Sequence, residues 1–527
     1  MSGLEGAGSL LRLWLRRDRV MVPVWVLALA ATLASTAASF TELYGVASER
    51  HAFAAGIAGN GATLALYGPV HADSLGGLVA WRMGVIGATF TALMSVFLVI
   101  RHSRAEEESG RLELLGSAAL GRRAPLASAV GVAVLANAVL AVLAALALRT
   151  AGLAWTGSAA FALSWLAAGL AFTGVAALSA QLSDNTRTAR GIALAALGTV
   201  FLVRAAGDAA GWQWLSWLSP LGWTSLTRPF AGERWWVPLL SVLLLAALTT
   251  AAFALSARRD LGAGILPPRL GPARGRLGGT TALAWRLQRG SFGGWMAGFA
   301  VYGAVIGGVA RNVSDLVGES TQTREVLARF GGRGGLSDVF LAATFGIISL
   351  IAAAYGVQAV LRLRGEETAG RLEPLLATGT GRLRWAAGHT AVAFAGTAVM
   401  LLTAGFTCGL VYALTTTDPG QIGRLTAAGS AQVPAAWVAT AAALLLFGAA
   451  PRAAQAAWGL LGACLLLSLL GPALRLPQAA LDLSPFTHTP RLPGGPVQTA
   501  PLLALLAITA ALSAVGFATW RRRDLSP

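Results

Sequence analysis

Long apolar runs, separated by short polar segments that carry arginine, dominate the chain. Most runs contain the ~17–25 apolar residues that a helix needs to cross a hydrocarbon core of ~30 Å. The first half has six such runs, at residues 20–40, 78–100, 125–148, 157–181, 190–206 and 237–257. The second half has six more, at residues 291–310, 338–361, 386–414, 432–450, 453–473 and 500–520. The pattern predicts an all-α polytopic membrane protein with about 12 transmembrane helices.

A dense charged motif occurs once in each half. The first copy reads Glu-Glu-Glu-Ser-Gly-Arg-Leu-Glu from Glu106, and the second reads Glu-Glu-Thr-Ala-Gly-Arg-Leu-Glu from Glu366. Each copy follows the second apolar run of its half, and each is followed by a Gly-Arg pair, at Arg122 and Arg382. Charge between apolar runs is costly unless it lies outside the bilayer. The duplication predicts two matched contact points for a partner.

The repetition divides the chain into two halves. We expect a first six-span half at residues 1–262, a Pro/Gly/Arg-rich linker at 263–282 and a second six-span half at 283–527. The tail from Arg522 echoes the Arg-Arg-Asp step from Arg258 that ends the first half. An even number of spans in each half makes the two repeats parallel, related by an axis along the membrane normal.

The N-terminus resembles a signal peptide at first sight. A basic segment precedes the first apolar run, and Thr36, Ala37 and Ala38 offer small residues for cleavage. The run is nevertheless long enough to span a bilayer, and a comparable run preceded by arginine reappears at residues 291–310. We therefore expect a retained first span.

Arginine sets the expected orientation. The net charge of +17 comes from 40 Lys+Arg residues, all of them arginine, against 23 Asp+Glu. If both termini lie inside, most arginines fall in cytoplasmic segments, as the positive-inside rule requires. Both termini, the linker and both charged motifs are therefore expected in the cytoplasm. Because the excess charge lies between apolar runs rather than on one folded face, no nucleic-acid binding is expected.

Composition disfavours several kinds of chemistry. Without lysine the chain lacks the Gly-Lys-Ser/Thr step of a Walker-type nucleotide site, so no cofactor is expected in this chain. Cys408 and Cys464 both lie inside apolar runs and the five histidines are scattered, so neither a disulfide framework nor a metal site is expected. No cluster of nucleophile and base is evident, so no catalytic residues are predicted and the chain is not expected to be an enzyme.

The charged motifs have a helical interpretation. Glu107 and Arg111 stand four residues apart, as do Glu367 and Arg371, which predicts helix-surface ion pairs worth ~0.2–0.5 kcal/mol. Neighbouring leucines predict a short amphipathic helix on the membrane surface. The alternative is a solvated loop whose charges only fix topology. Duplication in register favours a functional site, which comprises Glu106, Glu107, Gly110, Arg111, Leu112, Glu113, Glu366, Glu367, Gly370, Arg371, Leu372 and Glu373.

The segment between the fifth and sixth runs has a different composition. It contains six of the 17 tryptophans, around a Leu-Ser-Pro turn that recurs in the second half without tryptophan. This composition predicts an interfacial belt with a short helix that dips into the outer leaflet and is turned by proline and glycine. The candidate outer-gate residues are Leu218, Ser219, Pro220, Trp223, Leu483, Ser484 and Pro485.

The predicted spans carry few polar side chains. Arg82 and Arg204 lie near the outer ends of their spans, where snorkelling to the interface is the simplest expectation. Hydroxyl and amide side chains in the second and eighth spans could line a transport pathway, although such groups also hydrogen-bond between helices. These pathway candidates are Thr89, Thr91, Ser95, Thr344, Ser349, Tyr355 and Gln358.

Together these motifs resemble a known family. A Glu-Glu-x-x-Gly-Arg-Leu-Glu helix after the second span and a Leu-Ser-Pro turn after the fifth are similar to those of membrane subunits of type-2 ATP-binding-cassette exporters. The double length and the stretch from Leu218 to Trp236 resemble the polyketide-antibiotic or tetronasin exporter branch. The resemblance covers nearly the whole chain.

The resemblance implies a role for each motif. In that family the cytoplasmic motif is the coupling helix, which sits in a cleft of a separate ATPase subunit. The implied partners are two cytoplasmic ATPase subunits, most simply a homodimer, that bind ATP and Mg, together with the lipid bilayer and a lipophilic substrate. The second half departs from the pattern, because Pro374 replaces a leucine and the outer turn lacks tryptophans, so the outer gate is expected to be asymmetric.

The expected function is export of large lipophilic molecules, such as polyketide-type antibiotics, across a bacterial cell membrane. A strongly charged cargo would lose much hydration among spans that carry no fixed charge pair. The alternative is a twelve-span secondary multidrug transporter of the major-facilitator type, driven by an ion gradient. That family carries a Gly-x-x-x-Asp-Arg/Lys-x-Gly-Arg/Lys signature between its second and third spans, and this chain does not.

Overall fold

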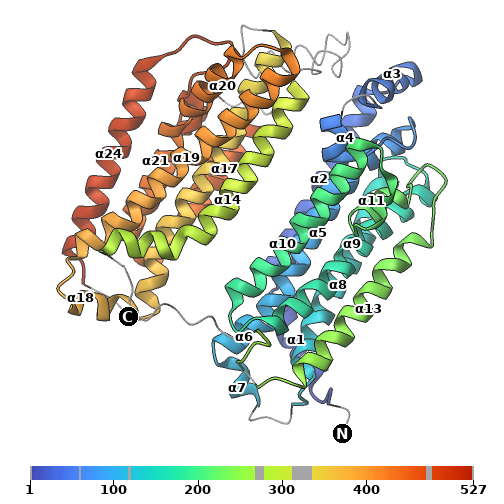
Figure 1. Cartoon of the computed structure of the whole chain (residues 1–527), viewed down its shortest axis with the longest axis horizontal. Helices are drawn as coiled ribbons and strands as arrows, with labels where there is room; N and C mark the ends of the chain where they lie inside the picture. The colour runs from blue at the N-terminus through green and yellow to red at the C-terminus, as the bar shows by residue number, and fades with distance from the viewer. Residues whose placement is uncertain are drawn as a thin grey trace. The chain divides into compact units, whose positions relative to one another are not determined.

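The computed structural model describes residues 3–58, 61–116, 120–260, 262–266, 278–310, 335–470 and 477–524. Within these residues the ordered elements are all helices, and eleven of them are long and apolar enough to cross a membrane (Figure 1). The predicted all-α polytopic membrane fold is confirmed.

The chain folds as two compact units, Met1–Gly271 and Pro272–Pro527, and the boundary lies inside the linker expected from the sequence. The first unit contains α1 (Ala7–Arg17), α2 (Met21–Leu43), α3 (Ala47–Ala58), α4 (Gly61–Tyr67), α5 (Leu75–His102), α6 (Arg104–Glu108), α7 (Arg111–Gly116), α8 (Ala124–Thr150), α9 (Trp155–Leu182), α10 (Thr186–Ala210), α11 (Gln213–Trp217), α12 (Gly222–Leu226) and α13 (Val237–Ser256). The second unit contains α14 (Thr280–Ala310), α17 (Leu336–Thr368), α18 (Leu372–Ala377), α19 (Arg382–Thr416), α20 (Gly420–Ser430), α21 (Val433–Ala449), η1 (Pro451–Ala453), α22 (Ala456–Leu470), α23 (Gln478–Leu481), η2 (Pro485–His488) and α24 (Thr499–Arg522).

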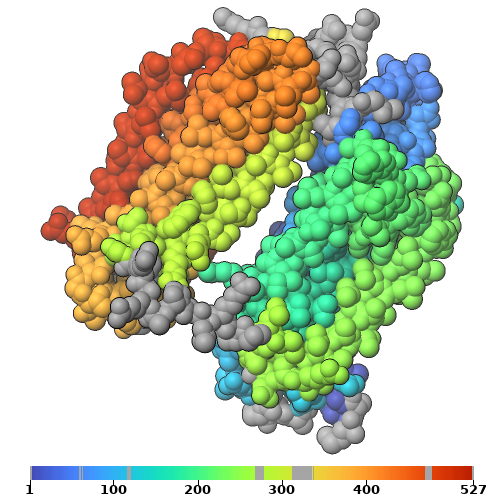
Figure 2. All heavy atoms as spheres, in the orientation of Figure 1, coloured from blue at the N-terminus to red at the C-terminus, as the bar shows by residue number. Residues whose placement is uncertain are grey.

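Helix α9 forms the centre of the first unit. It packs against α5, α8, α10 and α13, and most of its residues are buried. Its buried face is rich in alanine, glycine and serine, which let neighbouring helices approach closely in a lipid environment. Figure 2 shows that side chains fill the spaces between the ribbons within each unit.

In the second unit, α19 packs against α14 and α21 packs against α24. The α21–α24 contact depends on small residues, because a Cβ added at Gly448 would lie 2.2 Å from the carbonyl oxygen of Gly516. Backbone therefore meets backbone at this crossing, as in other membrane helix pairs built on small residues.

The helices correspond closely to the predicted spans, with two differences. The predicted span at 453–473 corresponds to α22, which ends at Leu470 and is shorter than the eleven spanning helices; residues 471–476 lie outside the described part. The second long helix of each unit also ends differently. A break at Ser103 separates α5 from α6, whereas α17 continues through the acid pair to Thr368.

The prediction that Arg204 snorkels to the interface is wrong. Its side chain is fully buried, and Arg204 Nη1 donates to Asp208 Oδ2 at 2.8 Å. Its other terminal nitrogen donates to the carbonyl oxygens of Ala65 and Leu66 on α4. A carboxylate one turn along α10 and two carbonyls on α4 bind the two terminal nitrogens of the guanidinium, so the buried charge is paired inside the unit. Arg82 remains exposed, with its guanidinium 4.4 Å from the ring centre of Tyr67.

Candidate functional site

A left-handed glycine ends the helix that carries the acid pair in both copies of the motif. Gly110 has a φ of 71° and Gly370 has a φ of 68°. Residues with a Cβ rarely adopt this conformation, so glycine is needed where the chain turns into the next short helix, α7 or α18. Each motif therefore consists of two helical segments joined by a turn at glycine. We call residues 104–116 and 364–377 the charged elements.

The predicted ion pairs between residues four positions apart, Glu107 with Arg111 and Glu367 with Arg371, are wrong because the glycine turn interrupts the helix. Arg111 Nη1 lies 3.7 Å from Glu106 Oε1, and Arg371 Nε donates to Glu366 Oε2 at 2.7 Å. In both copies the arginine thus pairs with the first acid rather than the second, because the helix ends before the arginine and the chain changes direction.

Arginines of the same chain neutralise Glu106 and Glu107, the acid pair of the first charged element. Glu107 accepts hydrogen bonds from Arg104 Nη1 at 2.7 Å and from both terminal nitrogens of Arg259, at 2.7 and 2.9 Å. Glu106 accepts from Arg17 Nη1 at the end of α1. The two carboxylates keep at most 9% of their side-chain surface exposed. Buried carboxylates need such partners, since an unpaired buried charge costs several kcal/mol.

The second charged element repeats this arrangement. Glu367 accepts a hydrogen bond from Arg523 Nη2 at 2.8 Å, and Arg364 Nη1 lies 3.1 Å from the same oxygen. Glu366 pairs with Arg371 and also with Arg362, whose Nε lies 3.4 Å away. Both carboxylates are again almost fully buried.

Each charged element has a buried side and an exposed side. Leu112 and Leu372 are buried and anchor the short helices to their units. Leu114 is 77% exposed, which is unusual for a large apolar side chain. On the short helices, the exposed side includes Arg111, Glu113 and Leu114 in the first element and Arg371, Glu373 and Pro374 in the second.

Two hollows lie beside the first charged element. One, of about 400 Å³, is lined by residues that include Glu107, Leu112 and Arg122. The other, of about 430 Å³, is lined by residues that include Trp14 and Leu114. The surface around the first charged element is therefore hollowed at two places.

The Leu-Ser-Pro turns lie at the opposite end of the units from the charged elements. Leu218 and Leu483 are exposed, whereas Ser219 and Ser484 are buried. Ser219 Oγ donates to the carbonyl of Val200 and accepts from an amide of its own turn, which fixes the turn between α11 and α12. Among the other candidate gate residues, Pro220 is buried, and Trp223 and Pro485 are half-buried.

The tryptophans next to this turn fit the expected interfacial belt. Trp217 and Trp236 stack at 5.5 Å between ring centres. Four others of the group are exposed or half-buried, with large apolar surface available to lipid: Trp212, Trp214, Trp223 and Trp235.

Most pathway candidates lie inside the packing of their unit. Thr91 and Ser95 are buried, donate to carbonyls of α5, and Ser95 Oγ accepts from Asn137 of α8 at 2.8 Å. Ser349 Oγ donates to the carbonyl of Gln432. Tyr355 and Thr344 are also buried. Within this conformation Thr89 is half-buried and Gln358 is exposed, with its amide oxygen accepting from Trp295. The pathway assignment stays a prediction.

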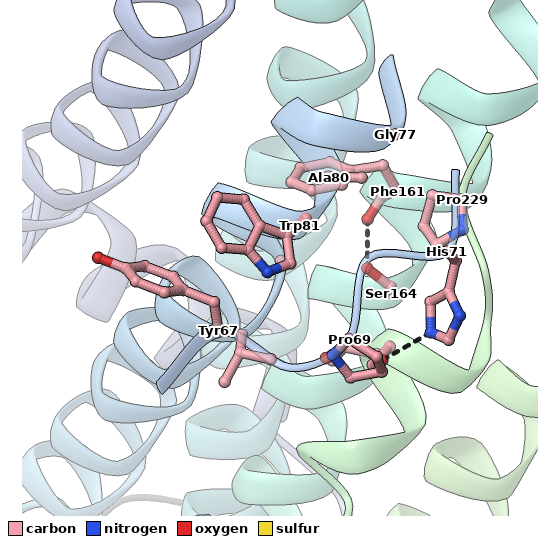
Figure 3. Close-up of a pocket in the computed structure, with 13 residues that line it drawn as sticks. Tyr67, Pro69, His71, Gly77, Ala80, Trp81, Phe161, Ser164 and Pro229 are labelled. Carbon is pink, nitrogen blue, oxygen red and sulfur yellow. Dashed lines mark hydrogen bonds between the residues drawn. The ribbon is translucent and has the colours of Figure 1, made fainter. Parts of the chain in front are cut away.

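A small cavity lies near the outer end of the first unit (Figure 3). It is lined by Tyr67, His71, Trp81 and Ser164 among others, and its volume is about 30 Å³. His71 Nε2 lies 3.0 Å from Ser225 Oγ. Burial, with nearby arginines, lowers the pKa of His71 to about 4, so the ring is neutral at pH 7. The cavity can hold about one water molecule and is far too small for a drug-sized ligand.

Sequence reasoning missed a second charged cluster next to the first charged element. Asp18 is fully buried between α1 and α2, hydrogen-bonds to His102 Nε2 and lies 3.1 Å from Arg101 Nε. Burial alone would raise the pKa of Asp18, but the contacts with His102 and Arg101 outweigh it and hold the pKa below its ordinary value. Trp14 stacks on His102 at 4.9 Å, so α1 is fastened to the end of α5. The residues stand more than 80 positions apart, and no local pattern connects them.

Comparison with known proteins gives the same family for both units. A family described as "Multidrug efflux system permease Rv1217c, C-terminal domain" matches residues 8–258 and 277–521. The multidrug efflux system permease protein Rv1217c of Mycobacterium tuberculosis (strain ATCC 25618 / H37Rv) is 46% identical over 528 residues, which cover 99% of this chain and 96% of that protein. These matches support the efflux permease family but not the narrower tetronasin branch. Fold and similarity together place the chain in the multidrug efflux permease family related to Rv1217c, as a multi-pass protein of the cell membrane.

Proposed function

We propose that this chain is the permease subunit of an ATP-driven exporter, and that separate ATPase subunits dock on the exposed sides of its two charged elements. The relative is named as the permease protein of an efflux system, which fits a transport subunit that works with other chains. ATP and Mg would bind in the partner ATPases, because this chain has no lysine and therefore no phosphate-binding P-loop.

The duplicated charged element carries the proposal. Each unit presents the same short helix, held by a buried leucine and displaying an arginine and a glutamate. Two matched surfaces on one chain suit a partner that is itself a pair of similar subunits. The exposed Leu114 adds an apolar contact to the first surface.

The buried acid pairs have a different part in this proposal. The sequence suggested that Glu106, Glu107 and their counterparts engage donors in the ATPase directly. In the structure each of these carboxylates pairs with arginines of the same chain and is almost inaccessible. We therefore assign docking to Arg111, Glu113, Leu114, Arg371 and Glu373, and assign to the acid pairs the task of holding these surfaces in place.

The cargo proposed is a large lipophilic molecule, of which polyketide-type antibiotics are the most specific example. The expectation that the spans carry no fixed charge pair is wrong, because Arg204 and Asp208 form a buried pair in α10. Each residue neutralises the other, so this pair offers no free charge to a charged solute. Apolar cargo crosses such helices without losing strong hydration. A secondary transporter driven by an ion gradient is the rival proposal. Such a carrier would use a buried titratable acid to carry the ion, whereas the buried Asp208 of α10 is already bound by Arg204 and Ser216.

The docking proposal is tested by purifying the chain from its native membranes. Co-purified chains that carry a Gly-x-x-x-x-Gly-Lys-Ser/Thr step are identified by mass spectrometry and assayed for ATP hydrolysis. Glu113→Arg combined with Glu373→Arg is expected to reduce the co-purified ATPase roughly tenfold or more, because reversed charges at a contact cost several kcal/mol.

Glu49→Arg combined with Asp482→Arg provides the control, because both residues are exposed acids outside the charged elements and the terminal Arg-Arg-Asp steps. This variant should retain the ATPase at the wild-type level. Absence of any ATPase from the wild-type preparation, or equal recovery with all three proteins, would refute the docking proposal.

A further inference from the structure

The segments that follow α13 and α24 hold the two charged elements in place through corresponding contacts. Arg259 and Arg523 follow the last helix of each unit, in the Arg-Arg-Asp step that recurs at the ends of the two halves. In Figure 1 the end of α13 reaches the same end of its unit as α6 and α7, and the end of α24 lies near α18.

The first contact of this set joins the last helix to the second acid. Arg259 donates to both oxygens of Glu107, at 2.7 and 2.9 Å, and Arg523 donates to Glu367 at 2.8 Å. More than 150 residues separate the members of each pair. Both pairs are largely buried, so water does not weaken them as it would at the surface.

The second contact comes from the Gly-Arg step that follows each motif. Arg122 Nη2 donates to the carbonyl oxygen of Arg259 at 2.8 Å, and Arg382 Nη1 donates to the carbonyl oxygen of Arg523 at 2.9 Å. The chain is therefore fastened to the same residue on both sides of the short exposed helix. Because these contacts recur in both units, we attribute to the Arg-Arg-Asp and Gly-Arg steps the same role, which is to hold the charged element against the last helix.

Each guanidinium also has a separate support within its own unit. Arg259 Nε donates to Gln181 Oε1 of α9 at 2.8 Å. Arg523 instead lies over the rings of Trp520 and Phe447, at 4.7 and 5.1 Å from their centres. The supports differ, but both hold the arginine side chain in the orientation in which it contacts the glutamate. A preorganised arginine is a better clamp than one free to rotate.

We infer that Arg259 and Arg523 are positioning residues that lock the charged elements to the last helix of each unit, so that a displacement of the docking surface moves α13 or α24 with it. We call each set of contacts a terminal latch: Arg259, Glu107 and Arg122 in the first unit, and Arg523, Glu367 and Arg382 in the second. The mechanical link from last helix to exposed surface stands on the geometry. Its use in coupling ATP hydrolysis to transport rests on the proposed function.

The latch is tested in the full-length permease by hydrogen–deuterium exchange. Arg259→Gln is expected to speed amide exchange in residues 104–116 roughly tenfold or more, because these amides lose the contact that holds their element. Exchange in the core of α8 and α9 should stay unchanged, which shows that the variant is folded. Arg259→Lys should give an intermediate rate, since lysine keeps the charge but not the bidentate geometry.

Arg258→Gln is the matched control, because Arg258 precedes Arg259 but is exposed. Arg523→Gln and Arg522→Gln repeat the comparison at residues 364–377. Unchanged exchange in both Arg259→Gln and Arg523→Gln, or equal acceleration in their controls, would overturn the latch.

Function is measured separately in the assembled exporter. The latch variants keep every exposed docking side chain, so they should retain co-purified ATPase, and they should lose several-fold more drug transport than ATP hydrolysis. If exchange responds in the variants but no ATPase co-purifies with the wild type, the latch stands and the proposed function fails. If an ATPase docks and exchange is unaffected, the proposed function stands and the latch fails.

Discussion

At the scale of single residues, the buried arginines show how much depends on partners that lie far away in the sequence. The position of Arg204 near the end of a predicted span suggested that its side chain extends to the membrane–water interface. Its actual partners are Asp208, one turn along α10, and two carbonyls of α4. The four-residue spacing to Asp208 was a signal in the sequence, but the α4 carbonyls could not be located from it. The charged motifs were identifiable from their duplication. Their arginine partners were not, since helix packing decides which arginine meets which acid.

The pair formed by Arg204 and Asp208 should be important for stability. Arg204→Leu leaves the Asp208 carboxylate buried with Ser216 as its remaining hydrogen-bond partner, and is expected to cost ~3–5 kcal/mol of unfolding free energy. Arg204→Leu combined with Asp208→Leu should recover much of this loss, because no unpaired charge remains. Thermal unfolding of the purified permease in detergent measures both.

Arg82→Leu is the control for this pair. Arg82 is exposed and makes a cation–π contact with Tyr67, so its loss should cost about 1 kcal/mol or less. If the single variant at Arg204 is as stable as the double variant, the buried pair does not have the role assigned here.

At the scale of elements, apolar length located the helices well, because a span must be long and apolar to cross a bilayer. The same pattern did not reveal where the helices turn. The sequence suggested a continuous helix through the charged motif, but Gly110 and Gly370 end it and redirect the following arginine. A glycine in a helical pattern is tolerated often enough that its presence alone does not fix an end. The recurrence of glycine at the same place in both copies was the sequence signal that could have indicated the helix end.

The crossing of α21 and α24 should be sensitive to single methyl groups. Gly448→Ala places a Cβ 2.2 Å from the carbonyl oxygen of Gly516, so the two backbones must separate. The cost is expected to be ~1–3 kcal/mol, seen as a lower unfolding temperature and a smaller monodisperse fraction in size-exclusion chromatography.

Gly516→Ala tests the same crossing with a milder change. Its Cβ would meet the nearest atoms, in the backbone of Leu444, at 3.1 Å, which a small shift can relieve. Stability should therefore fall less than for Gly448→Ala. Equal effects of the two substitutions would contradict the assigned backbone contact.

At the scale of the whole molecule, duplication is the main organising feature. Both units match the same family, both present a charged element after the second long helix, and both end in a terminal latch. The units are not identical. The first latch is bidentate and the second is a single hydrogen bond supported by aromatic rings, and the tryptophan belt belongs to the first unit. The chain therefore consists of two related halves, and the proposed function places its energy source in separate ATPase subunits.

The most direct test of that central claim is drug uptake into inverted membrane vesicles that contain the purified exporter complex. The account predicts that uptake of a lipophilic fluorescent drug requires ATP and Mg and continues when a protonophore collapses the proton gradient. Uptake should fall to background when the Glu113→Arg and Glu373→Arg variant replaces the wild type, because its ATPases no longer dock. Uptake that stops with the protonophore and proceeds without ATP would contradict the account and establish an ion-driven carrier instead.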